Sequence, residues 1–303
     1  DNSCLSQMAQ GWLQSFDKSL TVCSAGISPA IEVHPLAVQT LASSGIDISH
    51  HKPEAVEEYI DEPWDYVITV SRDAEEKIKA LIAPAGVSGI HFIDSGDYHY
   101  ISKIMTDFIK EPFTLVLIDH HTDMQDASLG GDILSCGNWA KKVLQKNPYL
   151  QKLVLIGQEK KVLDKLQSGA RQQETDGKLV EISYEELKNG KAHEKIKELP
   201  DEVPVYISID KDVLDEKYAV TNWDQGKMSM GMLEQILKTL VTEYDVIGVD
   251  ICGMYPEENS LPEYLRAERV NIRSDEELYR FLQKNLFCWA SHKSVSYTHL
   301  RAH

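Results

Sequence analysis

Short apolar runs alternate with amphipathic stretches through most of the chain after residue 89. A parallel strand covered on both faces has a continuous apolar sequence, and Leu115–Ile118 has this pattern. Similar runs predict strands at Ile90–Ile93, Leu153–Ile156, Val205–Ile209 and Val246–Val249. Helical patterns lie between them, at Ile101–Ile109, Trp139–Lys146, Lys161–Gln167, Tyr184–Leu199 and Gly231–Glu243. This alternation predicts an α/β fold, a three-layer α/β/α sandwich with a mainly parallel sheet.

A cluster of potential metal ligands follows the predicted strand Leu115–Ile118. Asp119, His121 and Asp123 occupy alternate positions, so in an extended chain their side chains share one face. In open α/β sheets the functional crevice lies beyond the carboxyl ends of the strands. The three side chains are therefore predicted to point together into that crevice.

A second cluster follows the predicted strand Val205–Ile209. Asp210 and Asp212 lie at strand spacing, and Lys211 between them is expected to face the other way. Either cluster alone would be typical of a solvated turn. Because both follow buried-strand patterns, a metal site is the favoured interpretation. Carboxylate and imidazole ligands suit manganese or another hard-to-borderline divalent ion.

These two clusters resemble the motifs of the ureohydrolase family, which includes arginase and agmatinase. Residues 119–123 match its D-x-H-x-D motif, and residues 208–215 match its S-x-D-x-D-x-x-D motif. The nearest counterpart of the family's Gly-Asp-His segment is Ser95-Gly96-Asp97-Tyr98-His99, which carries one extra residue. The resemblance covers about residues 85–290 and implies an arginase-like fold.

The resemblance also implies a centre of two Mn2+ ions bridged by Asp119 and Asp210. The implied ligands are His99, Asp119, Asp123 and Asp210 for one ion, and Asp119, His121, Asp210 and Asp212 for the other. Such a centre would cleave a C–N bond of a guanidino, amidine or related compound through a metal-bridging hydroxide. Asp123 would be the catalytic residue that orients the hydroxide and carries its proton.

Two substrate-recognition positions depart from the family pattern. Residues 135–140 resemble the family's Ser-Gly-Asn-x-His-Gly loop. Asn138 matches the asparagine of this loop and is expected to bind substrate. The position of the loop histidine is occupied by Ala140. In the late D-x-x-E-x-x-P frame, at residues 250–256, the glutamate that grips the guanidinium is Gly253. Glu257 or Glu258, just past this frame, is expected to supply the missing charge. The substrate is therefore expected to be a different guanidine or amidine, or an amide.

Residues 1–75 resemble arsenate reductases built on the low-molecular-weight tyrosine phosphatase fold. A helix is predicted at Ser6–Leu13, capped by Asn2 or Ser3, and a strand at Asp65–Val70. When the segment is aligned on residues 2–6, the family's nucleophilic cysteine falls before residue 1, and Leu5 holds the position of its loop arginine. We therefore expect a truncated, non-functional remnant of that α/β fold.

Composition limits the cellular compartment and the binding partners that we expect for the protein. The formal charge of −17 opposes binding to nucleic acid or anionic membranes and suits a small cationic substrate. The five cysteines are scattered and odd in number, which indicates reduced thiols in the cytoplasm. The sequence has no visible signal peptide and no apolar run of membrane-spanning length. The family resemblance implies a homo-oligomer.

The expected domains are a phosphatase-like segment at 1–75 and a metallohydrolase domain at 76–290. Residues 291–303 show no periodicity and resemble translated adaptor sequence, so we expect a non-native tail and exclude its histidines as ligands. This ending, and a start inside a phosphatase loop, leave two origins open for the chain, a natural fusion or an assembly artefact.

Two alternatives remain for the metal chemistry. A single-zinc, deacetylase-like amidohydrolase shares this architecture but uses one histidine and two aspartates. A catalytically degenerate metal-binding protein would also fit the two altered recognition positions.

Two other residues have structural interpretations: Cys252 is expected to be a small apolar side chain in a buried strand, and Trp139 a packing residue.

Overall fold

A computed structural model describes most of the chain. The described residues are all except 1, 17, 27–28, 56–57, 60–77, 81, 84–85, 127–133, 167–176, 256–260, 287–297 and 301–303. The chain divides into two compact units, Asp1–Glu76 and Lys77–Ala302. In the part of the chain that is described, no helix is both long and apolar enough to cross a membrane.

The first unit contains helices α1 (Leu5–Phe16) and α2 (Pro35–Ala42). Ala37, Leu41 and Ile48 form its small buried core, against which Met8 and Trp12 of α1 pack. Burial of this apolar stripe, more than intrinsic propensity, stabilises short helices of this kind. The predicted helix at residues 6–13 is confirmed within α1, whereas the predicted strand at residues 65–70 lies outside the described residues.

The second unit is built on one parallel sheet. Its strands are β1 (Ile90–Ile93), β2 (Phe113–Ile118), β3 (Leu150–Ile156), β4 (Leu179–Ile182), β5 (Val205–Asp210), β6 (Val246–Cys252) and β7 (Thr298–Leu300). They are ordered β4-β3-β2-β5-β6-β1-β7, and each pairing between these strands is parallel. The central strands β2 and β5 are buried along their whole length, because helices cover both faces of the sheet.

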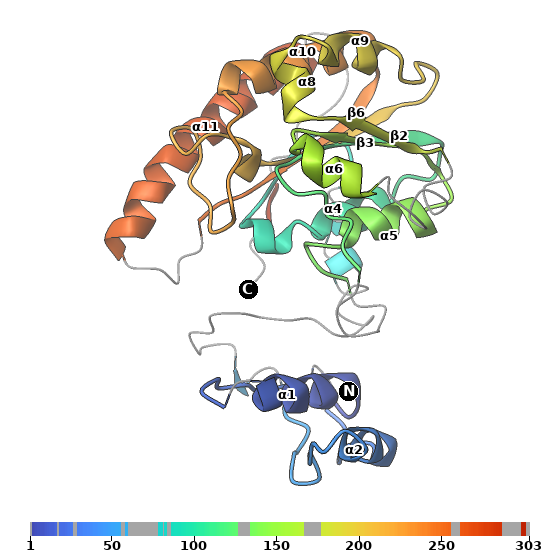
Figure 1. The fold of residues 1–303 in the computed structure, drawn as a ribbon, viewed down its shortest axis with the longest axis vertical. Helices are drawn as coiled ribbons and strands as arrows, with labels where there is room; N and C mark the ends of the chain where they lie inside the picture. The colour runs from blue at the N-terminus through green and yellow to red at the C-terminus, as the bar shows by residue number, and fades with distance from the viewer. Residues whose placement is uncertain are drawn as a thin grey trace. The chain divides into compact units, whose positions relative to one another are not determined.

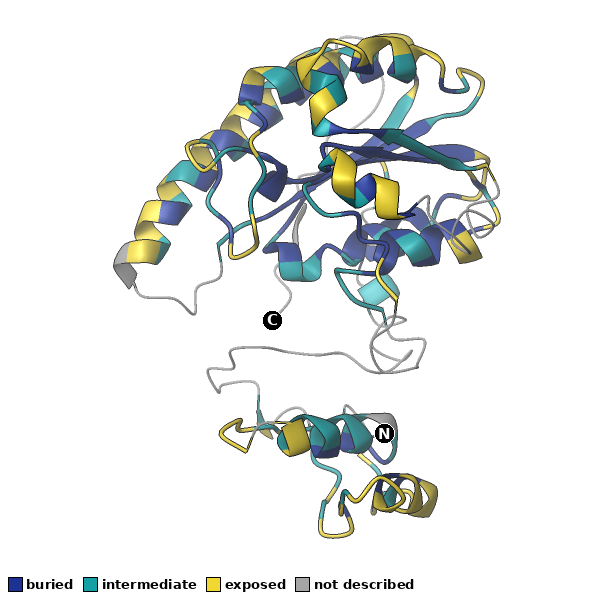
Figure 2. Cartoon of the chain, viewed as in Figure 1, coloured by how far each residue is buried: buried dark blue, intermediate teal, exposed yellow. Residues whose placement is uncertain are grey.

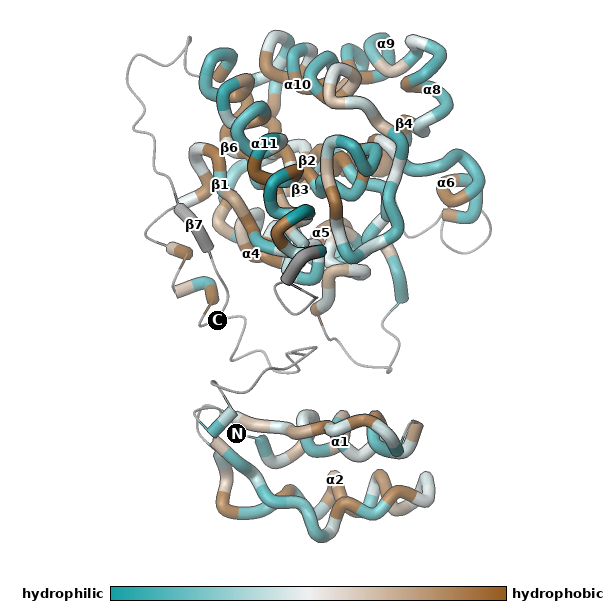
Figure 3. The backbone as a smooth tube through the Cα atoms, turned by 90° about the vertical axis from the view of Figure 1, so that its left-hand side faces the viewer, coloured by the Kyte–Doolittle hydropathy of each residue, from teal (hydrophilic) through white to brown (hydrophobic). Residues whose placement is uncertain are grey.

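Helices cover both faces of this sheet (Figure 1). One layer contains α4 (Ile101–Thr106), α5 (Trp139–Lys146) and α6 (Lys160–Leu166). The other contains α8 (Tyr184–Lys188), α9 (Ala192–Lys197), α10 (Met230–Glu243) and α11 (Leu261–Leu286). Figure 2 shows buried residues along the sheet and on the sheet-facing sides of the helices, and Figure 3 shows hydrophobic residues concentrated in the strands.

Alternating strand residues enter two separate cores. Leu115 and Leu117 pack with α4 and α5, whereas Val116 and Ile118 pack with the α10 layer. This is the period of two that an extended strand imposes. The predicted three-layer α/β/α sandwich with a mainly parallel sheet is confirmed.

Several element boundaries differ from the predicted ones. The single helix predicted over residues 184–199 is two helices, α8 and α9, because Gly190 adopts φ +72° between them. Strand β4 and helix α11 were not among the predicted elements; β4 is short and only partly buried, and α11 is rich in polar residues. Strand β7 pairs with β1 within the segment expected to be a non-native tail.

Candidate metal centre

Three segments bring their polar side chains to the carboxyl end of the sheet. Asp119 directly follows β2, and Asp210 is the last residue of β5. β2 and β5 are hydrogen-bonded neighbours in register at Ile118 and Ile209, so the next residues of the two strands lie side by side. His99 ends the short 3-10 helix η2 (Gly96–Tyr98) after β1.

His99 lies at the centre of the first ligand group. Its Nδ1 is 3.3 Å from Asp119 Oδ2, 3.1 Å from Asp123 Oδ2 and 3.5 Å from Asp210 Oδ2. All four residues are buried. Nitrogen and oxygen ligands that are each about 2.0–2.2 Å from one ion are separated from their neighbours by roughly 3 Å, so this spacing fits coordination of a shared cation.

The second ligand group contains Asp119, His121 and Asp212. His121 Nδ1 lies 2.7 Å from Asp212 Oδ2 and 3.7 Å from Asp119 Oδ1. Asp119 therefore presents Oδ2 to the His99 group and Oδ1 to the His121 group. A carboxylate that divides its oxygens in this way is placed to bridge two ions.

Asp210 is placed differently from the symmetrical bridge implied by the family resemblance. Its Oδ2 faces His99, while its Oδ1 accepts a hydrogen bond of 2.9 Å from the Asp212 backbone N–H. Among the candidate metal groups of the described residues, Asp210 belongs with His99 and not with His121. The bridging role of Asp210 remains a prediction.

The carboxylates of the centre repel one another in a buried space. Burial, with a contribution from the Asp119 charge, raises the pKa of Asp123 to about 6 and raises the pKa of Asp210. Burial and the Asp210 charge raise the pKa of Asp212 well above its usual range. Burial alone would also raise the pKa of Asp119, but hydrogen bonds with His121 and His99 lower it. A divalent cation would relieve this repulsion by neutralising the charge.

The two imidazoles are held among these carboxylates. Burial opposes a charge on His121, yet its hydrogen bonds with Asp119 and Asp212 raise its pKa to about 11. Burial likewise opposes a charge on His99, but Cys252, Asp119 and Asp123 raise the pKa of His99 well above its usual range. A metal ion binds the neutral imidazole, so it would take the place of a proton at each ring.

Supporting hydrogen bonds orient two of these ligands. The Trp139 indole Nε1–H donates to Asp123 Oδ2 at 2.5 Å, so this buried tryptophan has a polar role besides packing. His99 Nε2 lies 2.8 Å from Ser208 Oγ, which donates to Asp250 Oδ1 at 2.6 Å. Such partners fix the orientation of a ligating imidazole. Spacing in the sequence carried no signal for either contact.

The predicted substrate residues are only partly located. Asn138 is buried, and its Oδ1 accepts a hydrogen bond from the Ser135 backbone N–H at 3.0 Å. Ala140 is the second residue of α5 and is fully buried in the core between this helix and the sheet. Glu257 lies outside the described residues. The proposed binding roles of Asn138 and Glu257 remain predictions.

The architecture and the ligand groups define an α/β protein with a candidate two-metal centre at the carboxyl end of a parallel sheet. The model of the arginase family matches residues 28–262, so the chain belongs to the arginase family. The proclavaminate amidino hydrolase of Streptomyces clavuligerus has a similar fold, with a TM-score of 0.51 at 17% identity over 72% of each chain.

Two relatives match different lengths of the chain. An uncharacterised protein of Thermotoga maritima is 31% identical over 184 residues, which is 61% of this chain and 65% of the relative. This chain therefore spans just under two thirds of the length of that protein. An arsenate reductase of Staphylococcus aureus is 37% identical over 92 residues, 30% of this chain and 68% of the reductase. The expected partial similarity to arsenate reductases is thus confirmed.

Proposed function

We propose that this arginase-family protein is a hydrolase with two Mn2+ ions that cleaves a C–N bond of a guanidino, amidine or related compound. The observation that carries the proposal is the division of the Asp119 carboxylate between the His99 group and the His121 group. A site for one ion would not need a carboxylate shared in this way. The oxygen and nitrogen donors of both groups suit manganese.

The residues of the centre have separable roles in this scheme. His99, Asp119, Asp123 and Asp210 would hold one ion, and Asp119, His121 and Asp212 the other. When bound, a pair of divalent ions lowers the pKa of water and provides a nucleophile at neutral pH. Asp123 would orient this nucleophile against the substrate and carry its proton to the leaving nitrogen.

The backbone at Asp123 supports this assignment. Asp123 adopts φ +49°, a left-handed conformation that few residues other than glycine occupy. The indole of Trp139 holds the carboxylate from one side, and His99 Nδ1 lies 3.1 Å from the same oxygen. Uncommon backbone angles that the surroundings hold in place are frequent at functional sites.

We further infer a small cationic substrate, a cytoplasmic setting and a homo-oligomer. The net charge of −17 favours approach of a cation. The four cysteines in the described part of the chain are free thiols, as expected for a reducing compartment.

We propose that the first unit is a catalytically inactive arsenate reductase-like segment, because Leu5 stands where the anion-binding arginine is expected.

Metal analysis combined with a substrate panel tests the proposal. The full chain loaded with Mn2+ should contain two ions per chain and release urea or ammonia from at least one guanidine, amidine or amide. Asp210→Asn should lose bound metal and lower activity by more than about 100-fold, because replacing even an outer partner of a ligand costs 10–100-fold.

Asp164→Asn is the matched control, since Asp164 is exposed on α6 and pairs with Lys160. It should keep both ions and full activity. One ion per chain would replace the proposal with a single-metal amidohydrolase. Two ions without hydrolysis across the panel would indicate a degenerate metal-binding protein.

A further inference from the structure

The cysteine at the end of β6 faces the candidate metal centre. Cys252 and Asp210 are register partners on neighbouring parallel strands, so their side chains leave the same face of the sheet. Cys252 is fully buried, and its Sγ lies 3.1 Å from Asp210 Oδ2. The thiol therefore contacts a predicted ligand directly, although the sequence indicated only an apolar strand residue.

The thiol also lies within coordination range of the histidine of this group. A ring nitrogen of His99, a carboxylate oxygen of Asp210 and Cys252 Sγ all lie within 4.8 Å of one another, and all three residues are buried. His99 Nδ1 is 3.5 Å from Asp210 Oδ2. Metal–sulfur bonds of about 2.3 Å and metal–nitrogen bonds of about 2.0–2.1 Å are compatible with this arrangement around one ion.

The close approach of the two strand ends depends on the next residue. Gly253 adopts φ +99°, and a Cβ at this position would lie 2.7 Å from Asp210 Oδ1 and 2.9 Å from the Lys211 backbone nitrogen. A larger residue would separate the ends of β5 and β6. The glycine that stands where the family pattern predicts a glutamate thus lets the ends of β5 and β6, which carry Asp210 and Cys252, lie close together.

We propose that Cys252 is a thiolate ligand of the ion beside His99, and that this position binds a thiolate-accepting ion such as Zn2+, Fe2+ or Co2+ in preference to Mn2+. The inference rests on the proposed metal centre and changes the expected ion at only one of its two positions. The group formed by Asp119, His121 and Asp212 keeps oxygen and nitrogen donors. Thiolate donors select softer ions than carboxylates do.

Coordination replaces the thiol proton and needs no redox partner. In the metal-free protein the Cys252 thiol donates its proton toward Asp210 Oδ2. On binding, a sulfur–metal bond forms, the S–H bond breaks and the proton leaves to solvent. Metal binding by the native chain should therefore release one more proton than binding by a variant without the thiol.

Cobalt titration of the metal-free full chain provides a direct test. Thiolate coordination gives a sulfur-to-cobalt charge-transfer band in the near ultraviolet, whereas imidazole and carboxylate ligands do not. The native chain should show this band, and Cys252→Ser should lose it while it still binds cobalt. Cys252→Ser should also lower the ratio of the Mn2+ to the Zn2+ dissociation constant by at least about tenfold, measured by competition between the two ions.

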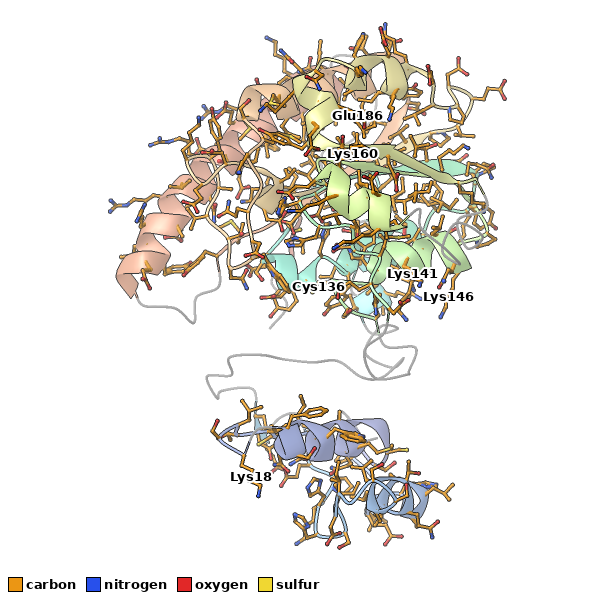
Figure 4. The ribbon with its side chains drawn as sticks, viewed as in Figure 1. Lys18, Cys136, Lys141, Lys146, Lys160 and Glu186 are labelled. Atoms are coloured by element: carbon orange, nitrogen blue, oxygen red, sulfur yellow. The ribbon has the colours of Figure 1, made fainter. Side chains whose placement is uncertain are left out.

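Cys136→Ser is the control, because Cys136 lies in the loop before α5 and is not a member of the candidate groups in the described residues (Figure 4). It should keep the band. Cys252→Ala provides a second test if the serine variant does not fold. A native chain that binds cobalt without the band, or a Cys252 variant that keeps it, would overturn only the thiolate ligand. A native chain that binds no cobalt would also overturn the metal centre itself.

Discussion

Gly253 is the residue at which this chain differs most consequentially from its family pattern. The D-x-x-E-x-x-P frame predicts a glutamate at this position. The backbone of Gly253 instead has φ +99°, and a Cβ added there would lie 2.7 Å from Asp210 Oδ1, too close for a side chain to fit without moving Asp210. The glycine therefore does more than remove a negative charge that was predicted to bind substrate. It allows β5 and β6 to end close together, with Asp210 and Cys252 in contact.

We predict that Gly253→Ala weakens metal binding. The added methyl group would displace Asp210, and the left-handed backbone would be strained by about 1–3 kcal/mol. Because changing even an outer partner of a metal ligand costs about 10–100-fold in affinity, displacing Asp210 itself should raise the dissociation constant of the metal about tenfold or more, measured by calorimetric titration.

Gly190→Ala separates strain from displacement. Gly190 also has a positive φ, +72°, but a Cβ added at this position would meet no atom within 4 Å. This control should lose stability and retain metal affinity. Equal losses of affinity in both variants would contradict the proposed contact with Asp210.

At the scale of elements, a buried ion pair connects the ligand segment to α11. Lys211 lies in the 3-10 helix η3 (Lys211–Val213) and is 1% exposed, and its Nζ is 2.6 Å from Asp275 Oδ1 of α11. The expectation that Lys211 faces away from the ligands fits this pairing. The ion pair positions η3, and hence Asp210 and Asp212, against the helical layer.

We predict that Asp275→Asn lowers the free energy of unfolding by about 3 kcal/mol, because it leaves a buried ammonium group without its charged partner. The double variant Lys211→Met with Asp275→Asn should recover most of this loss, since it removes the unpaired charge. Urea denaturation of the native chain and both variants measures the two effects.

Glu276→Gln provides the control for charge loss on the same helix. Glu276 pairs with Arg280 on the exposed side of α11, where such a pair contributes about 0.3–0.5 kcal/mol. If Asp275→Asn were no more destabilising than this control, the proposed role of the Lys211 pair would be wrong.

At the scale of the whole molecule, charge should affect substrate capture. The chain carries 31 basic and 48 acidic residues, a formal charge of −17. We predict that KM for a cationic guanidine rises at least about twofold between low and high salt, as screening shortens the Debye length from about 30 Å at 0.01 M to about 3 Å at 1 M. A neutral amide substrate should show little change, and equal salt effects on both would contradict electrostatic attraction.

The local pattern determined much of this fold. The apolar runs marked β1, β2, β3, β5 and β6, and the ligand clusters marked the carboxyl ends of β2 and β5. These features are encoded locally, because strand burial requires a continuous apolar run and a shared face requires alternate positions. The weak signals of β4 and the polar surface of α11 explain why those elements were not predicted.

Only the tertiary structure decided which ligands meet. The order β4-β3-β2-β5-β6-β1-β7 makes β2 and β5 neighbours, and it brings His120 and His121 to Asp212, which lies 92 and 91 positions later in the chain. The contacts of Trp139 with Asp123 and of Cys252 with Asp210 likewise depend on segments that are distant in sequence. Periodicity specifies the face of one element, but the separation between side chains on different elements is fixed by how those elements pack.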